Sequence, residues 1–201
     1  NAGEGGILVT NEPDIFWKSV FMSGSYENNY MLHSSYCLDI AEKYKNKLPV
    51  FNVRMNNLTA ALAIPQIQNI ERTIDHINSN YIRFIKSLKE YDLIGFPSQK
   101  KEIRPVRDSA QMRIKIPESS RTKLKLDLNS AGLPISYFGG KNNTNARLYQ
   151  NWKFLNIENA VLPNTQKYLS EVFDLRLPIH FKLEHIDTIV KTFIEVLNHI
   201  K

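Results

Sequence analysis

The chain has 201 residues, of which 42% are hydrophobic and 23% charged, a composition that is ordinary for a globular protein and excludes a disordered one. Its formal net charge of +6 would suit an anionic partner, but its lysines and arginines are scattered in small groups, which argues against nucleic acid and against a membrane surface. No apolar run approaches the roughly 18 residues that would span a membrane.

Cysteine and histidine usage narrows the chemistry further. The single cysteine, Cys37, excludes an internal disulfide framework and fits a reducing compartment, so we expect a cytoplasmic protein. The histidines show no metal-ligand spacing, and no metal site is predicted. Only His180, near the end of a predicted strand, suggests a functional role, and capping or packing is the competing interpretation.

The first segment of the chain is rich in glycine. Residues 3–10, GEGGILVT, predict a glycine-rich turn that feeds a short strand. A phosphate-binding P-loop is not indicated, because no Lys-Ser/Thr pair follows Gly6. Residues 14–22 predict a short helix capped by Asp14.

The next segment, residues 23–47, is polar and rich in Tyr and Asn. Its pattern is too irregular to assign, apart from a helix at 37–45. A segment of this length without strong periodicity is uncommon in a compact domain and is often a binding loop.

Residues 50–91 organise the rest of the chain. From Ile67 to Tyr91, apolar residues recur in alternating steps of three and four, which predicts a long amphipathic helix. Pro65 interrupts the pattern, since a proline inside a helix costs about 3 kcal/mol. We therefore expect either a kink, or a short helix that ends near Ile64 and a long one that starts at Pro65.

A polar and basic cluster precedes this helix. Asn52, Arg54, Asn56 and Asn57 stand just before the apolar run 58–64. Such side chains beside the free N–H groups and positive dipole of a helix start could form an anion site. The alternative is that Asn56 or Asn57 caps the helix and Arg54 is an ordinary surface residue.

The remaining residues alternate between strand and helix patterns. Residues 119–131 are ambiguous, because their leucines alternate as in a strand while Ser119 or Ser120 and Gly132 frame a helix; we expect a helix. The predicted order is strand 93–97, strand 112–116, helix 119–131, strand 133–138, helix 162–170, strand 173–177 and helix 183–200. This order predicts a small α+β layer with helices on one face of a sheet.

Three motifs, taken together, resemble a known family. GEGGILVTNEPD is followed by FNVRMNNLTAALAIPQI and then by the tail LPNTQKYLSEVFDLRLPIHFKLEHIDTIVKTFIEVL. In this order they resemble the DegT/DnrJ/StrS family of pyridoxal-phosphate (PLP) sugar aminotransferases. The match covers nearly the whole chain and is far more specific than any one motif.

The resemblance implies a fold and an assembly. It implies the α/β, aspartate-aminotransferase-like PLP fold (fold type I), of which this chain would be the C-terminal portion. Residues 1–49 would end the large domain, 50–91 would form the motif and connecting helix, and 92–201 would form the small α+β domain. No catalytic residue is expected in this chain, because the Schiff-base lysine would lie upstream of Asn1. Family members are homodimers with shared active sites.

The resemblance also implies site residues. Asn52 and Arg54 match a family motif whose Asn and Arg reach across the dimer to the cofactor phosphate or substrate of the neighbouring site. Tyr26 and Tyr137 are candidate substrate-binding residues.

Three departures from the family pattern concern substrate identity more than fold. Val53 stands where a tyrosine is usual. Pro65 stands where the family helix has a small residue. Ser136-Tyr137-Phe138 stands where many members have a strand end containing histidine.

The implied activity is transfer of an amino group from an amino acid such as glutamate to a keto-sugar, with sugar phosphates and nucleotide sugars both left open. PLP is the implied cofactor, and small molecules, not nucleic acids or membranes, are the implied partners. The alternative is a catalytically inactive C-terminal half that acts as a partner or regulatory subunit.

Overall fold

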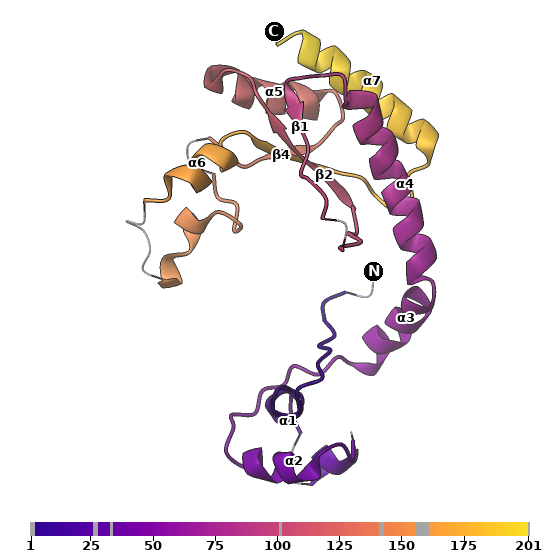
Figure 1. Cartoon of the computed structure of the whole chain (residues 1–201), viewed down its shortest axis with the longest axis vertical. Helices are drawn as coiled ribbons and strands as arrows, with labels where there is room; N and C mark the ends of the chain where they lie inside the picture. Colours follow the sequence, from indigo (N-terminus) through magenta and orange to yellow (C-terminus); the bar gives the residue numbers. More distant parts are fainter. Residues whose placement is uncertain are drawn as a thin grey trace. The chain divides into compact units, whose positions relative to one another are not determined.

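A computed structural model describes residues 3–25, 28–32, 34–100, 102–140, 143–155 and 161–200. The chain forms two compact units, unit 1 (Asn1–Ile70) and unit 2 (Glu71–Lys201), and each is described by itself (Figure 1). No helix among the described residues is both long and apolar enough to cross a membrane.

Unit 1 is helical around a small aromatic core. It contains α1 (Pro13–Met22), a 3-10 turn η1 (Asn29–Leu32), α2 (Leu38–Tyr44) and α3 (Asn57–Gln68). Its buried apolar side chains are Trp17, Phe21, Tyr30 and Ala41. The indole Nε1 of Trp17 donates to the backbone oxygen of Tyr36 at 2.8 Å, which ties α1 to the loop before α2. The predicted helices at 14–22 and 37–45 are confirmed.

The predicted capping role of Asp14 is wrong. Glu12 occupies the N-cap position of α1, and Pro13 begins the helix, where its fixed φ and missing N–H cost nothing. The Asp14 carboxylate instead lies 2.9 Å from Lys43 Nζ and accepts a hydrogen bond from Tyr44. It therefore joins α1 to α2.

The strand predicted within residues 3–10 does not form in the described structure. A strand needs a hydrogen-bonded neighbour, and no strand of unit 1 is present among the described residues to pair with it. The apolar side chains of this segment are left exposed, with Val9 at 89% of its maximal accessibility.

The break predicted at Pro65 occurs at Asn69 instead. Pro65 lies inside α3, which continues to Gln68, and α4 (Ile70–Leu88) follows. A proline removes one backbone hydrogen bond but does not forbid further helical residues after it. The Asn69 side chain donates to the carbonyl oxygen of Pro65 at 2.8 Å, which satisfies a group at the helix end.

Unit 2 confirms the predicted order of strands and helices. After α4 come β1 (Ile94–Gly95), β2 (Ser109–Ile114), α5 (Glu118–Ser130), β3 (Ile135–Tyr137), the short turns η2 (Tyr149–Asn151) and η3 (Lys153–Leu155), α6 (Pro163–Leu169), β4 (Val172–Arg176) and α7 (Leu183–Asn198). The strands form one antiparallel sheet in the order β1-β2-β4-β3.

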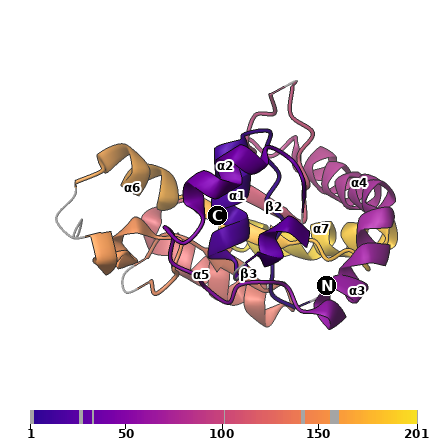
Figure 2. The same cartoon turned by 90° about the horizontal axis from the view of Figure 1, so that it is seen from below.

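One face of this sheet is covered by helices. Buried side chains from α4, α5 and α7 join those of β2, β3 and β4 in a single core. The Phe84 ring lies 6.0 Å from that of Phe193, and Arg83 pairs with Asp187, so α4 and α7 run side by side in both views (Figures 1 and 2). The predicted one-sided α+β layer is therefore correct.

The ambiguous segment 119–131 is helical, as predicted. Leu124 and Leu128 are fully buried whereas Leu126 is 57% exposed, the pattern of a helix face and not of a strand. The helix begins just after Pro117, so neither Ser119 nor Ser120 is its N-cap. Gly132 follows its end with a φ of +83°, which only glycine adopts readily.

Candidate functional site

In unit 1, the segment that carries Asn52 and Arg54 is held by the end of α1. The backbone N–H of Phe51 donates to the Met22 oxygen at 2.8 Å, and that of Val53 donates to the Ser23 oxygen at 3.4 Å. These two bonds fix the backbone on both sides of Asn52. The side chains of Asn52 and Arg54 are exposed.

Gly24 allows a close approach to this segment. Its φ is +117°, and a Cβ there would lie 2.9 Å from the Phe51 carbonyl oxygen and 3.9 Å from Arg54 Nε. Gly5 has a φ of +149°, and a Cβ there would meet the flexible end of the Met55 side chain at 2.8 Å from Cε. The glycine-rich segment, the turn after α1 and the Asn52–Arg54 segment therefore meet in unit 1.

The start of α3 lies directly beyond Arg54. Asn56 is the N-cap, and its side-chain oxygen accepts from the Thr59 N–H at 2.8 Å. The capping interpretation of Asn56 is thus confirmed. It is compatible with an anion site, because the cap satisfies one N–H while the positive end of the helix dipole remains beside Arg54.

Ser25 is a feature that sequence reasoning missed. Its side chain is only 4% exposed, and its hydroxyl has no hydrogen-bond partner among the described residues. Buried hydroxyls nearly always have a partner in the protein, water or a ligand. A lone serine in an irregular segment gives no sequence signal, so only the fold reveals it.

Tyr137, a candidate substrate-binding residue, lies in unit 2. Its ring is buried and stacks on Phe173 at 4.6 Å, and its hydroxyl donates to the Ser170 backbone oxygen at 2.9 Å. Burial raises the pKa of Tyr137, so the phenol stays protonated. The remaining candidate, Tyr26, lies outside the described residues.

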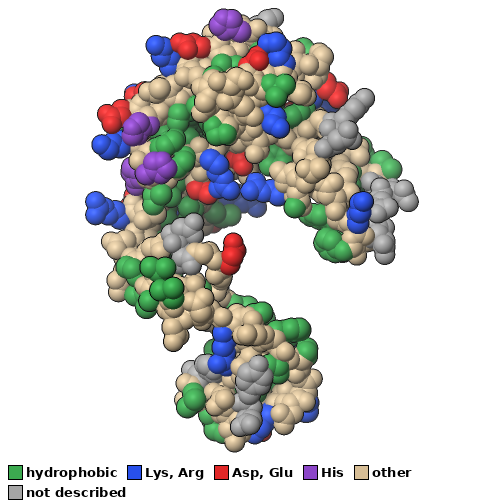
Figure 3. Space-filling view, turned by 180° about the vertical axis from the view of Figure 1, so that it is seen from behind, with side chains coloured by type: hydrophobic (Ala, Val, Ile, Leu, Met, Phe, Trp, Pro, Cys, Tyr) green, Lys and Arg blue, Asp and Glu red, His purple; other side chains and the backbone are tan. Residues whose placement is uncertain are grey.

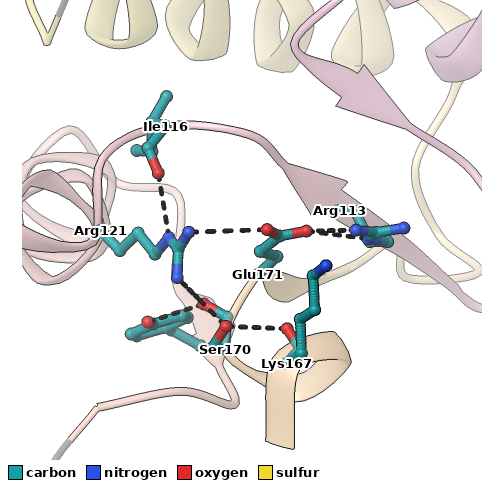
Figure 4. Close-up of polar contacts among 7 residues, drawn as sticks. Arg113, Ile116, Arg121, Lys167, Ser170 and Glu171 are labelled. Carbon is teal, nitrogen blue, oxygen red and sulfur yellow. Dashed lines mark hydrogen bonds and ion pairs between the residues drawn. The ribbon is translucent and has the colours of Figure 1, made fainter. Parts of the chain in front are cut away.

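Beside Tyr137, Glu171 joins the elements of unit 2, and sequence reasoning missed it. Figure 4 shows its carboxylate between two guanidinium groups: Arg113 Nε lies 3.0 Å from one oxygen and Arg121 Nη2 lies 3.7 Å from the other. Arg121 also donates to the backbone oxygens of Ile116 and Ser170, at 3.1 and 2.9 Å. The network links β2, α5 and the α6–β4 junction.

Because of Glu171, the stability of unit 2 should fall at acid pH. The hydrogen bond from Arg113 is the main cause that lowers the pKa of Glu171 below its ordinary 4.5. A lowered pKa means that this stabilisation is present above pH 4.5 and is lost as pH falls through the pKa of the folded state. Glu171→Gln should therefore lower the Tm of unit 2 at pH 7, and the difference from wild type should shrink as the pH falls below 4.5.

Circular-dichroism melts from pH 7 to pH 3 measure this difference. Glu184→Gln is the matched control: its carboxylate is 71% exposed and lies 3.9 Å from Lys182, and exposed pairs contribute little. A Glu171→Gln difference that stays constant across the pH range would contradict the assignment.

The described histidines are not arranged as a metal site. No group of three or more His, Cys, Asp or Glu side chains that could hold a metal occurs among the described residues. His180 is exposed and packs edge-on against Phe181, with ring centroids 4.8 Å apart. This contact supports the packing interpretation of His180.

Comparison with known proteins identifies the family. The sequence profile of the DegT/DnrJ/EryC1/StrS aminotransferase family matches residues 1–194. The chain belongs to this family. A search among curated proteins found no significant match.

Several solved structures share the fold of this chain. The chain superposes on an Escherichia coli GDP-4-keto-6-deoxy-D-mannose-3-dehydratase with bound hydrated PLP at a TM-score of 0.64 and 18% identity, over 92% of this chain and 49% of that one. A DegT/DnrJ/EryC1/StrS aminotransferase from Brucella abortus gives 0.62 and 17%, over 92% and 44%. Helicobacter pylori PseC, an aminotransferase of pseudoaminic acid biosynthesis, gives 0.60 and 15%, over 76% and 40%.

These matches confirm the predicted fold class, the α/β fold of type I PLP enzymes. At such low identity they establish the fold alone. The chain spans about half the length of the solved structures that it matches, or somewhat less.

Proposed function

We propose that the complete protein is a PLP-dependent aminotransferase that moves an amino group from an amino acid such as glutamate to a keto-sugar, and that this chain is its C-terminal portion. Family membership over residues 1–194 is the observation that carries the proposal. The Schiff-base lysine would be supplied by a segment that precedes Asn1. The domain limits at residues 49 and 91 and a cytoplasmic location are part of the same proposal.

The residues around Arg54 fit the phosphate group of PLP. A phosphate needs several hydrogen-bond donors and positive charge, which the Arg54 guanidinium, the Asn52 amide and the start of α3 provide. Gly24 has no side chain that would collide with the Phe51 carbonyl oxygen, so the Asn52–Arg54 segment can lie close to it. The buried Ser25 hydroxyl has no hydrogen-bond partner among the described residues. These features support the resemblance-based assignment of Asn52 and Arg54.

In this proposal the residues of this chain bind and orient the cofactor and the substrate. PLP, when bound, supplies the electron sink for amino transfer. Arg54 and Asn52 would hold the phosphate end. Tyr26 remains a proposed substrate contact. For Tyr137 we propose an indirect role, because its buried hydroxyl is already bonded to Ser170.

A homodimer with shared sites is also proposed, supported by the surface of α3. None of its residues is buried, and Figure 3 shows hydrophobic side chains gathered over it. Leu58, Leu62 and Ile64 are 73%, 50% and 56% exposed. Exposed apolar surface of this kind marks an interaction site. A second copy that covers α3 would bring Asn52 and Arg54 to the partner's cofactor.

Leu62→Lys should therefore weaken the dimer, because it places a charge in an apolar interface. We expect a shift from dimer to monomer in sedimentation velocity at micromolar concentration. Ile82→Lys on α4 is the control, since Ile82 is 45% exposed but lies in unit 2. If both variants sediment like the wild-type protein, α3 does not form the interface.

The function itself is tested with protein expressed from the complete reading frame. Incubated with PLP, glutamate and a panel of keto-sugars, it should release more than one equivalent of 2-oxoglutarate per active site only when a keto-sugar acceptor is present. PLP binding with sugar consumption but no 2-oxoglutarate would indicate a different PLP reaction. Absence of PLP binding would favour the inactive partner or regulatory subunit.

A further inference from the structure

A second candidate site lies in unit 2, beside Tyr137. An open pocket of about 340 Å³ is lined by residues 138–140 after β3, by residues within 143–151 and by the end of α6. This volume is near the lower end of the range of about 300–1,000 Å³ for ligand pockets, which suits a small molecule. Its lining is apolar at Phe138, Leu148 and Leu169 and otherwise polar but uncharged, with Gly139, Gly140, Asn143, Gln150, Asn151, Gln166 and Ser170.

The orientation of the Asn151 amide is fixed by its partners. Its Nδ2 donates to the backbone oxygens of Asn143 and Asn145, at 3.0 and 2.8 Å. A carbonyl oxygen only accepts, so the amide nitrogen must be on that side. No described residue donates to the opposite atom, Oδ1 of Asn151, which remains available as an acceptor.

The other carboxamides of the pocket differ in what they leave available. Asn143 Oδ1 already accepts from the Asn145 N–H at 3.0 Å. Asn143 Nδ2 donates to the Tyr137 oxygen at 2.8 Å, and Gln166 Nε2 donates to the Tyr149 hydroxyl at 2.9 Å. Gln166 Oε1 accepts from no described residue, and Gln150 forms no described side-chain hydrogen bond. Asn151 and Gln166 therefore each keep an amide oxygen available as an acceptor, and Gln150 keeps both its oxygen and its N–H donors.

The wall behind these acceptors is closely packed. A Cβ at Gly139 would collide with the Tyr137 hydroxyl and lie 2.9 Å from Ser170 Cα. The Tyr137 hydroxyl is itself bonded to the Ser170 oxygen. Glycine is therefore required at 139. Tyr137 packs behind Gly139 and Ser170, two of the residues that line the pocket.

We propose that this pocket binds the uncharged ring of a sugar. Sugar hydroxyls would donate to the oxygens of Gln150, Asn151 and Gln166. The apolar face of the sugar ring would pack on the apolar lining residues of the pocket. None of the described lining residues carries a positive charge to attract a phosphate or carboxylate. That this sugar is the amino acceptor rests on the proposed function.

The direct test is a titration of ¹⁵N-labelled protein expressed from the complete reading frame, followed by the NMR signals of the side-chain amides. D-glucose, D-galactose, D-mannose and their 6-deoxy forms are the neutral probes, and glucose 6-phosphate and inorganic phosphate are the charged ones. We expect saturable shifts of the Gln150, Asn151 and Gln166 amides with at least one neutral hexose. We expect none of these shifts with inorganic phosphate, and no gain in affinity for glucose 6-phosphate over glucose.

Two variants and one control complete the test. Gln150→Leu and Asn151→Ala should each weaken hexose binding about tenfold, the loss expected for one hydrogen bond of about 1.4 kcal/mol. Gln150 makes no described contact that folding requires, so its variant remains informative if Asn151→Ala disturbs the loop. Gln111→Leu, an exposed glutamine on β2, should bind as wild type does.

Absence of shifts with every hexose, or tighter binding of the phosphorylated sugar, would overturn the inference. These measurements need no PLP, so they separate the two proposals. Hexose binding without amino transfer would overturn the proposed function alone, whereas amino transfer that survives Gln150→Leu and Asn151→Ala unchanged would overturn the pocket.

Discussion

Arg54→Ala is expected to raise the dissociation constant for PLP by about 10- to 100-fold. A hydrogen bond to a charged group contributes about 1.5–3 kcal/mol, and every 1.4 kcal/mol is a factor of ten. Arg54→Lys should lie between wild type and Arg54→Ala, because lysine keeps the charge but not the planar fork that binds two phosphate oxygens. The exposed Arg72 of α4, replaced by alanine, is the matched control.

The comparison between PLP and pyridoxal makes this prediction specific. Pyridoxal lacks the phosphate, so a residue that binds the phosphate should change PLP affinity and leave pyridoxal affinity almost unaltered. Both constants can be obtained from visible absorbance titrations of the protein expressed from its complete reading frame. An equal loss of affinity for both ligands would mean that Arg54 acts through the fold of unit 1 and not on the phosphate.

Trp17→Ala is expected to unfold unit 1. Replacing a buried aromatic residue by alanine costs about 3–5 kcal/mol, and Trp17 is the largest of the four buried apolar side chains described there. Its ring contacts those of Phe16 and Tyr30, with centroids 5.0 and 5.8 Å apart, and its N–H is bonded to Tyr36. The end of α1 that holds Phe51 and Val53 would be released.

Hydrogen exchange read by mass spectrometry distinguishes the two units. In Trp17→Ala, the amides of α1 and α2 should lose their protection while those of α4 and α7 keep it. Trp152→Ala is the control, because Trp152 is 37% exposed and belongs to unit 2. Retained protection of α1 and α2 would show that the aromatic cluster does not hold unit 1 together.

Elements whose signal is local were predictable from the sequence. The apolar spacing of α7 and the alternation in β2 depend on neighbours within a few residues, and both elements form as expected. The strand expected within residues 3–10 failed because pairing depends on a neighbour that the described part of the chain does not supply. The helix break near Pro65 was misplaced because proline weakens a helix without fixing where it ends.

Some residues of the candidate sites could be predicted from the sequence, and others could not. Asn52 and Arg54 were proposed as site residues because they match a family motif, and their role stays a prediction. The roles of Gly24, Ser25 and Glu171 arise from contacts with distant parts of the chain, such as the approach of Gly24 to Phe51 and the pairing of Glu171 with Arg113. Contacts between residues that are far apart in the chain cannot be predicted from a short sequence pattern.

The central claim, that this chain is part of a PLP-dependent aminotransferase, is tested most directly by a single half-reaction. PLP-loaded protein from the complete reading frame is mixed with glutamate alone, and its visible spectrum and 2-oxoglutarate are followed. We predict loss of the PLP absorbance with stoichiometric release of 2-oxoglutarate, and recovery of the absorbance when the keto-sugar is added. An unchanged spectrum with glutamate and every other amino donor would contradict the claim.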